Sequence, residues 1–99
     1  MKSKLNSEKI LKEIEKRKAD IRKYGVKKIG LFGSYAKNKQ KKKSDIDFLI
    51  EFRKVNFDNF FAMIFLLEKM FKKKIDLVIE DDLKPELKYV KKEAKYVKI

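Results

Sequence analysis

The sequence contains neither cysteine nor histidine among its 99 residues. Without cysteine there are no disulfide bonds and no thiolate metal sites, and without histidine the commonest general base and the commonest zinc ligand are missing. Any bound metal must therefore have oxygen ligands, which favours Mg²⁺, Mn²⁺ or Ca²⁺. Carboxylates then become the main candidates for acid–base chemistry.

Long apolar runs are also absent. The longest apolar stretch, from Phe60 to Leu67, is far too short to span a bilayer, and no signal-peptide pattern is present. We therefore expect a soluble, cytoplasmic protein that does not bind membranes. The short length predicts one domain over residues 1–99, and the 43% of hydrophobic residues suffice for its core.

Negative charge is scarce relative to positive charge: 28 lysines and arginines oppose 15 acidic residues, which gives a net charge of +13. Such an excess is typical of a protein with a polyanionic partner, such as nucleic acid or nucleotide. It is also typical of a lysine-rich composition of the kind found in thermophiles. The lysines are spread over the whole chain, which favours the compositional explanation.

Apolar periodicity predicts three helices. The first covers about residues 6–24, with Ser7 as a plausible N-cap and Gly25 as the residue that ends it. The second covers residues 58–73 and begins at a cap formed by Asn56 or Asp58. Pro85 fits the first turn of the third, which runs to about residue 94.

Three strands are predicted between these helices, at residues 26–32, 45–52 and 74–80. The helix between the second and third strands suits a right-handed parallel crossover, whereas the polar connection between the first two allows an antiparallel pair. We therefore predict an α/β (α+β) fold, a small mixed β-sheet with helices packed on it.

Two aspartates on the second predicted strand are separated by one residue. Because side chains alternate along a strand, Asp45 and Asp47 lie on the same face and can converge on one or two hard cations. Asp76 lies early in the next strand and meets this pair if the two strands are neighbours. Three converging carboxylates repel one another unless a cation lies among them, so the arrangement predicts a metal site.

Gly33 and Ser34 follow the first predicted strand and precede a short helical turn. Glycine allows a phosphate to approach the backbone, where N–H groups and the serine hydroxyl can bind its oxygens. Together with the aspartates, this turn resembles a nucleoside-triphosphate site in which Asp76 accepts a proton. Each motif alone is weak, since an isolated Asp-x-Asp is more often a solvated strand face.

The order and spacing of the motifs are more specific. The segments Leu31–Lys37 and Ser44–Phe52 resemble the nucleotidyltransferase superfamily typified by DNA polymerase β. Residues 8–99 are similar to the minimal nucleotidyltransferases of that superfamily, including Ile75–Val78, Leu83–Pro85 and Lys92–Ala94. The resemblance implies the small α/β nucleotidyltransferase fold.

The resemblance also implies a role for each motif. Gly33 and Ser34 match the nucleotide-phosphate-binding motif, Asp45 and Asp47 match the metal-binding pair, and Asp76 matches the third acidic residue, so that all three aspartates are expected to be catalytic and to bind metal. The family usually has Arg then Gly where this chain has Lys37 and Asn38. Lysine keeps the charge for nucleotide binding but loses the bidentate fork, and asparagine tolerates a left-handed backbone.

The activity implied is nucleotidyl transfer from ATP with two Mg²⁺ ions, for which Mn²⁺ can substitute. Many minimal members are encoded beside a small helical partner, as in MntA–HepT toxin–antitoxin systems, where the antitoxin transfers AMP to a tyrosine of the toxin. We therefore expect a protein adenylyltransferase with a HepT-like acceptor. The alternatives are transfer to a small molecule or an RNA end, and a non-catalytic nucleic-acid-binding module.

Phe57, Phe60 and Phe61 lie close together at the start of the second predicted helix, and not all need belong to the core. A patch there would be a candidate interface.

Overall fold

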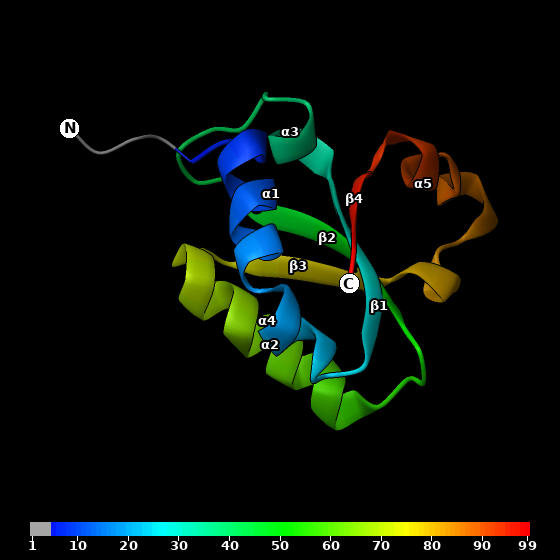
Figure 1. The fold of residues 1–99 in the computed structure, drawn as a ribbon. Coiled ribbons are helices and arrows are strands. Elements are labelled where there is room, and N and C mark those ends of the chain that lie inside the picture. Colours follow the sequence, from blue (N-terminus) through cyan, green and yellow to red (C-terminus); the bar gives the residue numbers. More distant parts are fainter. Residues whose placement is uncertain (1–4) are drawn as a thin grey trace.

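A computed structural model describes residues 5–99 and contains a four-stranded mixed β-sheet (Figure 1). Its strands, in the order β3-β2-β1-β4, are β1 Val26–Phe32, β2 Ile46–Phe52, β3 Ile75–Ile79 and β4 Lys95–Lys98. Strand β1 pairs antiparallel with both β2 and β4, whereas β2 and β3 are parallel. The predicted fold class, the antiparallel first pair and the parallel crossover are therefore confirmed.

Helices on one face of the sheet enclose the core (Figure 1). They are α1 Ser7–Lys16, α2 Lys18–Arg22 and α4 Phe57–Phe71. The opposite face carries the C-terminal segment, which consists of the 3₁₀ turns η1 Glu80–Asp82 and η2 Pro85–Leu87 and the helix α5 Tyr89–Glu93. A short helix, α3 Gly33–Ala36, follows β1 directly.

The core follows the two periodicities of the sequence. Alternate residues of β2 point into it, and all four are buried, as expected from a period of two: Ile46, Phe48, Ile50 and Phe52. The apolar side chains that α1, α2 and α4 turn towards the sheet are also buried: Ile10, Ile14, Ile21, Met63, Leu67 and Phe71. Leu49, on the opposite face of β2, is also buried.

The first predicted helix proves to be two helices. The backbone N–H of Arg17 is shared between the carbonyl oxygens of Glu13 and Ile14, and this residue leaves helical geometry with φ −101°. Ser7 is not the N-cap; Asn6 is, because its side chain accepts a hydrogen bond of 2.9 Å from the N–H of Lys9.

Ser7 is instead buried, and its hydroxyl donates to the Asn38 side chain at 3.3 Å. Gly25, with φ 77°, completes the turn into β1, three residues beyond the last residue of α2 rather than at the helix end itself.

The predicted C-terminal helix is broken into η2 and α5. No residue of either element is buried, so no apolar stripe holds a longer helix together. In α4 the N-cap is Asn56, one of the two predicted caps, whose side chain accepts from the N–H of Asn59 at 3.2 Å. Phe57 and Phe61 are exposed, which confirms that the three phenylalanines at the start of this helix do not all belong to the core.

Within residues 5–99, none of the helices combines the length and the apolar character needed to cross a membrane.

Candidate active site

The parallel pairing of β2 with β3 places two aspartates side by side. Asp47 and Asp76 are register partners, each the second residue of its strand. Both alternate with buried core residues, so their side chains lie on the face opposite the core. Asp45 immediately precedes β2 and is exposed. Asp76 was predicted to lie beside this pair if the two strands were neighbours, and they are.

The proximity of these carboxylates affects the pKa of Asp47. Burial, followed by the charge of Asp76, raises the pKa of Asp47 from 3.8 to about 6. A hydrogen bond with Asp76 and the charge of Asp45 act in the same direction. The three acidic groups therefore interact electrostatically, and a cation bound among them would relieve their repulsion.

Gly33 lies against this acidic group. It has φ +73°, and a Cβ atom at this position would overlap the Asp47 carboxylate. Register explains the contact, because Phe32, the residue before Gly33, pairs with Asp47 across β1 and β2. Ser34 is the second residue of α3 and is partly buried. The glycine-serine turn and the carboxylates thus form one site.

The donor set fits a hard cation. In the part of the chain that the structure describes, no three acidic side chains are already gathered closely enough to hold an ion by themselves. Mg²⁺ does not require such a cage, because it usually takes one or two carboxylates and completes its octahedron with water and substrate phosphates. Asp47 and Asp76, with Asp45 beside them, supply that number of oxygen donors.

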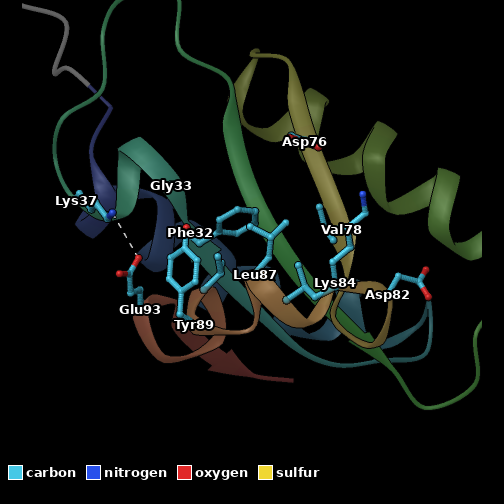
Figure 2. Close-up of a pocket in the computed structure, with 12 residues that line it drawn as sticks. Phe32, Gly33, Lys37, Asp76, Val78, Asp82, Lys84, Leu87, Tyr89 and Glu93 are labelled. Atoms are coloured by element: carbon cyan, nitrogen blue, oxygen red, sulfur yellow. Dashed lines mark ion pairs between the residues drawn. The ribbon is translucent and has the colours of Figure 1, made fainter.

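A cavity of about 540 Å³ opens beside the acidic group, between the sheet and the C-terminal segment (Figure 2). Gly33, Lys37 and Asp76 line one part of it. The rest of the wall is mostly apolar and consists of Phe32, Val78, Leu83, Leu87, Tyr89 and Val90, with Asp82, Lys84 and Glu93. A polar end next to the Gly33–Ser34 turn and an apolar remainder suit a nucleotide.

Lys37 extends from the end of α3 and forms an ion pair of 3.4 Å with Glu93 of α5 (Figure 2). The next residue, Asn38, has φ 55°, so it adopts the left-handed backbone that asparagine was expected to tolerate. The predicted tolerance of this substitution is therefore confirmed at the level of the backbone.

The structure brings all the predicted site residues into one region, although only Gly33, Lys37 and Asp76 line the cavity itself. Glu93 and the apolar wall, including Tyr89, were not predicted as site residues. Except for Phe32 and Val78, which belong to β1 and β3, these residues lie four to fourteen residues beyond β3, in segments without strong periodicity. The only sequence signal for them is the similarity of Leu83–Pro85 and Lys92–Ala94 to the minimal nucleotidyltransferases.

A mixed sheet with a Gly-Ser turn, paired aspartates on adjacent strands and a nucleotide-sized cavity defines a nucleotidyltransferase-like protein. The sequence profile of the nucleotidyltransferase domain family matches residues 7–98, and the chain belongs to this family.

Named relatives agree with this assignment. The chain is 35% identical over 94 residues to the protein adenylyltransferase MntA of Thermococcus cleftensis, covering 88% of this chain and 95% of that protein. It is 45% identical over 71 residues to a Methanocaldococcus jannaschii protein named "Putative protein adenylyltransferase MJ0128", covering 71% and 70% of the two chains. The enzyme class predicted from the sequence is thus confirmed.

Solved structures share the fold. A structure described as a minimal nucleotidyltransferase superposes with a TM-score of 0.80 at 25% identity, covering 95% of this chain and 98% of that one. A toxin–antitoxin structure with AMP-PNP superposes with a TM-score of 0.67 at 24% identity, covering 93% and 72%.

Proposed function

We propose that this protein transfers AMP from ATP to a tyrosine hydroxyl of a HepT-like partner protein and acts as the antitoxin of that pair. The observation that carries the proposal is the cross-strand pair of Asp47 and Asp76 beside Gly33, at the edge of a nucleotide-sized cavity. The relative named protein adenylyltransferase MntA supports a protein acceptor. The same fold in a toxin–antitoxin complex with AMP-PNP supports ATP as the donor.

Each site residue has a role in this proposal. Gly33 and Ser34 offer N–H groups and a hydroxyl to the phosphates, and Lys37 neutralises the end of the triphosphate. Asp45, Asp47 and Asp76 would hold Mg²⁺, which, when bound, neutralises charge on the reacting phosphates. The apolar wall that includes Val78, Leu83 and Tyr89 accommodates the nucleoside.

The reaction is an in-line displacement at the α-phosphorus. The acceptor hydroxyl oxygen forms a bond to this phosphorus while the bond to the oxygen that bridges to the β-phosphorus breaks. Pyrophosphate leaves with the electron pair of that bond. The Asp76 carboxylate, exposed at the cavity wall, accepts the hydroxyl proton and releases it to solvent.

The direct test is incubation with labelled ATP, Mg²⁺ and the protein encoded by the neighbouring gene, followed by mass spectrometry for added AMP. Asp45→Asn and Asp47→Asn should abolish transfer, and Asp76→Asn should lower kcat more than it weakens ATP binding. Asp20→Asn, on α2, is the control and should transfer normally. The proposal would be refuted if the wild-type protein added no AMP to the partner protein, or if Asp47→Asn kept full activity.

A second candidate function is nucleotidyl transfer to an RNA end. The observation in its favour is a cavity of about 490 Å³ lined in part by Lys41, Lys42 and Lys73, where phosphates could bind. In the same experiment, label on added RNA but not on the partner protein would select this function.

A further inference from the structure

Helix α4 carries a line of exposed phenylalanines, the aromatic stripe, formed by Phe57, Phe61 and Phe65. Their exposed fractions are 73%, 55% and 70%. A spacing of four residues places all three on one side of the helix, along about 12 Å of its length. Exposed apolar side chains that cluster in this way mark an interaction surface.

The aromatic stripe lies away from the candidate active site. The other side of α4 buries Met63, Leu67 and Phe71 in the core, and this core lies on the sheet face opposite the cavity. Figure 1 shows α4 and the C-terminal segment with α5 on different sides of the sheet. An acceptor docked on the stripe would not reach Asp76 directly, whereas a second copy docked there leaves both cavities open.

Two side chains of opposite charge lie beside the aromatic stripe, one near each end of it. Asp58 and Lys69 are both exposed, and neither takes part in an ion pair within residues 5–99. They are 11 residues apart in the sequence, which places them within about 20° of each other around the helix and about 16 Å apart along it. The helix therefore carries a free negative charge near its start and a free positive charge near its end, on the same side.

This arrangement is complementary to itself. If two α4 helices pack antiparallel about a twofold axis near residue 63, Phe61 of each chain faces Phe65 of the other. The same axis brings Asp58 of each chain opposite Lys69 of the other to within one residue of register. A twofold interface requires this property, that the same patch be used by both copies. We propose that a second copy of this chain docks on the aromatic stripe through antiparallel pairing of α4.

The exposed area indicates a weak dimer. The exposed fractions of the three phenylalanines add up to about two whole side chains, which corresponds to roughly 300–500 Å² per copy. Val55, 51% exposed just before the helix, adds to this surface. Both copies together therefore approach the roughly 1,000 Å² needed for a specific interface, which is at the low end for stable complexes.

Sedimentation of the full-length chain over a concentration series tests the proposal. The wild type should change from monomer to dimer as its concentration rises, and Phe61→Gln/Phe65→Gln should remain monomeric with an unchanged melting temperature. Leu87→Gln, which removes a 40% exposed apolar side chain on the opposite face, should dimerise like the wild type. A wild type that stays monomeric, or a stripe variant that dimerises normally, would overturn the proposal.

Charge exchange tests the antiparallel geometry. Asp58→Lys alone and Lys69→Asp alone should each dimerise about tenfold more weakly, because two ion pairs become two repulsions. An equal mixture of the two variants should regain wild-type association, since each contact then joins opposite charges. The control variants Asp20→Lys and Lys23→Asp make the same charge changes at and next to α2, away from the stripe. Mixing these two variants should not strengthen dimerisation beyond that of each variant alone. Absence of rescue in the first mixture would reject this pairing.

The salt dependence of binding distinguishes a second copy on the stripe from an acidic partner protein. Two chains of charge +13 repel each other, and we expect screening of this repulsion to exceed the weakening of the two exposed ion pairs, so salt should strengthen the dimer. An acidic protein bound at the stripe would instead be released by salt. Stripe-dependent binding of such a partner, without self-association, would replace the proposal.

Discussion

At the scale of single residues, Gly33 connects the turn at the start of α3 with the acidic group. Its φ of +73° disfavours any side chain, and its missing Cβ provides the space that the Asp47 carboxylate occupies. Gly25 has a similar φ of +77°, but the nearest atom to its virtual Cβ is 3.9 Å away. The two glycines therefore separate the cost of backbone strain from the cost of displacing Asp47.

Gly25→Ala should lower the free energy of unfolding by about 1–2 kcal/mol through the left-handed backbone alone. Gly33→Ala should lower it further and should also weaken ATP binding, because Asp47 must move. Urea unfolding and nucleotide titration measure both effects. Equal losses of stability at the two glycines, with normal ATP binding, would contradict the close packing of Gly33 against Asp47.

Asp47 makes the protein less stable in the absence of a cation. Its pKa is about 6 in the folded chain against 3.8 for a free side chain, so the folded state binds more protons between these values. Stability should therefore fall as pH rises from about 4 to 6 and stay reduced above that range. The full shift of about two units corresponds to roughly 3 kcal/mol, and partial exposure lowers the expected effect to about 1 kcal/mol.

Asp47→Asn should consequently stabilise the metal-free protein by about 1 kcal/mol at pH 7, with no gain below pH 4. It should also abolish AMP transfer and the rise in melting temperature on adding Mg²⁺. Melting curves from pH 4 to 8, with Asp20→Asn as the control, measure this. A destabilised Asp47→Asn protein at pH 7 would contradict the repulsion described for the site.

Under the proposed function, Glu93 competes with the triphosphate for Lys37. Both side chains are exposed, so their 3.4 Å ion pair is weak and the phosphates can replace it. Glu93→Gln removes both the competitor and a negative charge at the cavity wall, and it should lower KM for ATP about threefold with little change in kcat. Glu86→Gln, an exposed glutamate in η2, is the control. An increased KM in Glu93→Gln would indicate that Glu93 assists binding.

At the scale of elements, Glu80 links the C-terminal segment to the sheet through ion pairs. It is 8% exposed and forms ion pairs with Lys28 of β1 at 3.5 Å and with Lys91 of α5 at 3.6 Å. Lys28 also lies 4.5 Å above the ring of Tyr96 in β4. Burial, together with the carboxylates of Glu80 and Glu51, raises the pKa of Tyr96 to about 12.

Glu80→Gln should lower the free energy of unfolding by about 1–2 kcal/mol, because two lysines lose their partner. It should also raise KM for ATP, since α5 forms part of the cavity wall. Removing the Glu80 charge should shift the pKa of Tyr96 back towards 10, which tyrosinate absorbance detects. Glu86→Gln again serves as the control. An unchanged pKa of Tyr96 would show that Glu80 does not interact with it in solution.

Strands and motifs were more predictable from the sequence than helix breaks. Alternation along β2 fixes which residues are buried, and with it the face that carries Asp47. The break at Arg17 and the division of the C-terminal helix have no such local signal, because they depend on packing against the sheet. Which of Phe57, Phe60 and Phe61 are exposed could not be predicted, since phenylalanine is apolar on either side of a helix and only tertiary structure decides which side is buried.

The site illustrates the same limit. Asp45, Asp47 and Asp76 could be connected because period two and a parallel crossover determine where they lie, and Gly33 could be added through the family resemblance. The ion pair between Lys37 and Glu93 could not be derived, because it depends on how a segment without strong periodicity folds back over the sheet.

At the scale of the whole molecule, the two faces of the sheet carry different features. One carries the acidic group and the cavity, and the other carries the core helices and, outside them, the aromatic stripe. The chain carries a net charge of +13. The eight ion pairs within residues 5–99 leave most of the lysines without an acidic partner, so the folded protein is subject to self-repulsion.

This repulsion predicts how stability depends on salt. The net charge of +13 destabilises the compact state, and added salt screens it, so the melting temperature should rise between low and physiological ionic strength. The ion pairs are mostly exposed, and their weakening by salt should be the smaller effect. Replacing Lys41, Lys42 and Lys43 with Gln should reduce the salt dependence, whereas replacing Glu8, Glu15 and Glu86 with Gln should increase it. Melting curves in KCl at a dilution where the chain is monomeric measure the effect, and a melting temperature that falls with salt would show that the ion pairs outweigh the repulsion.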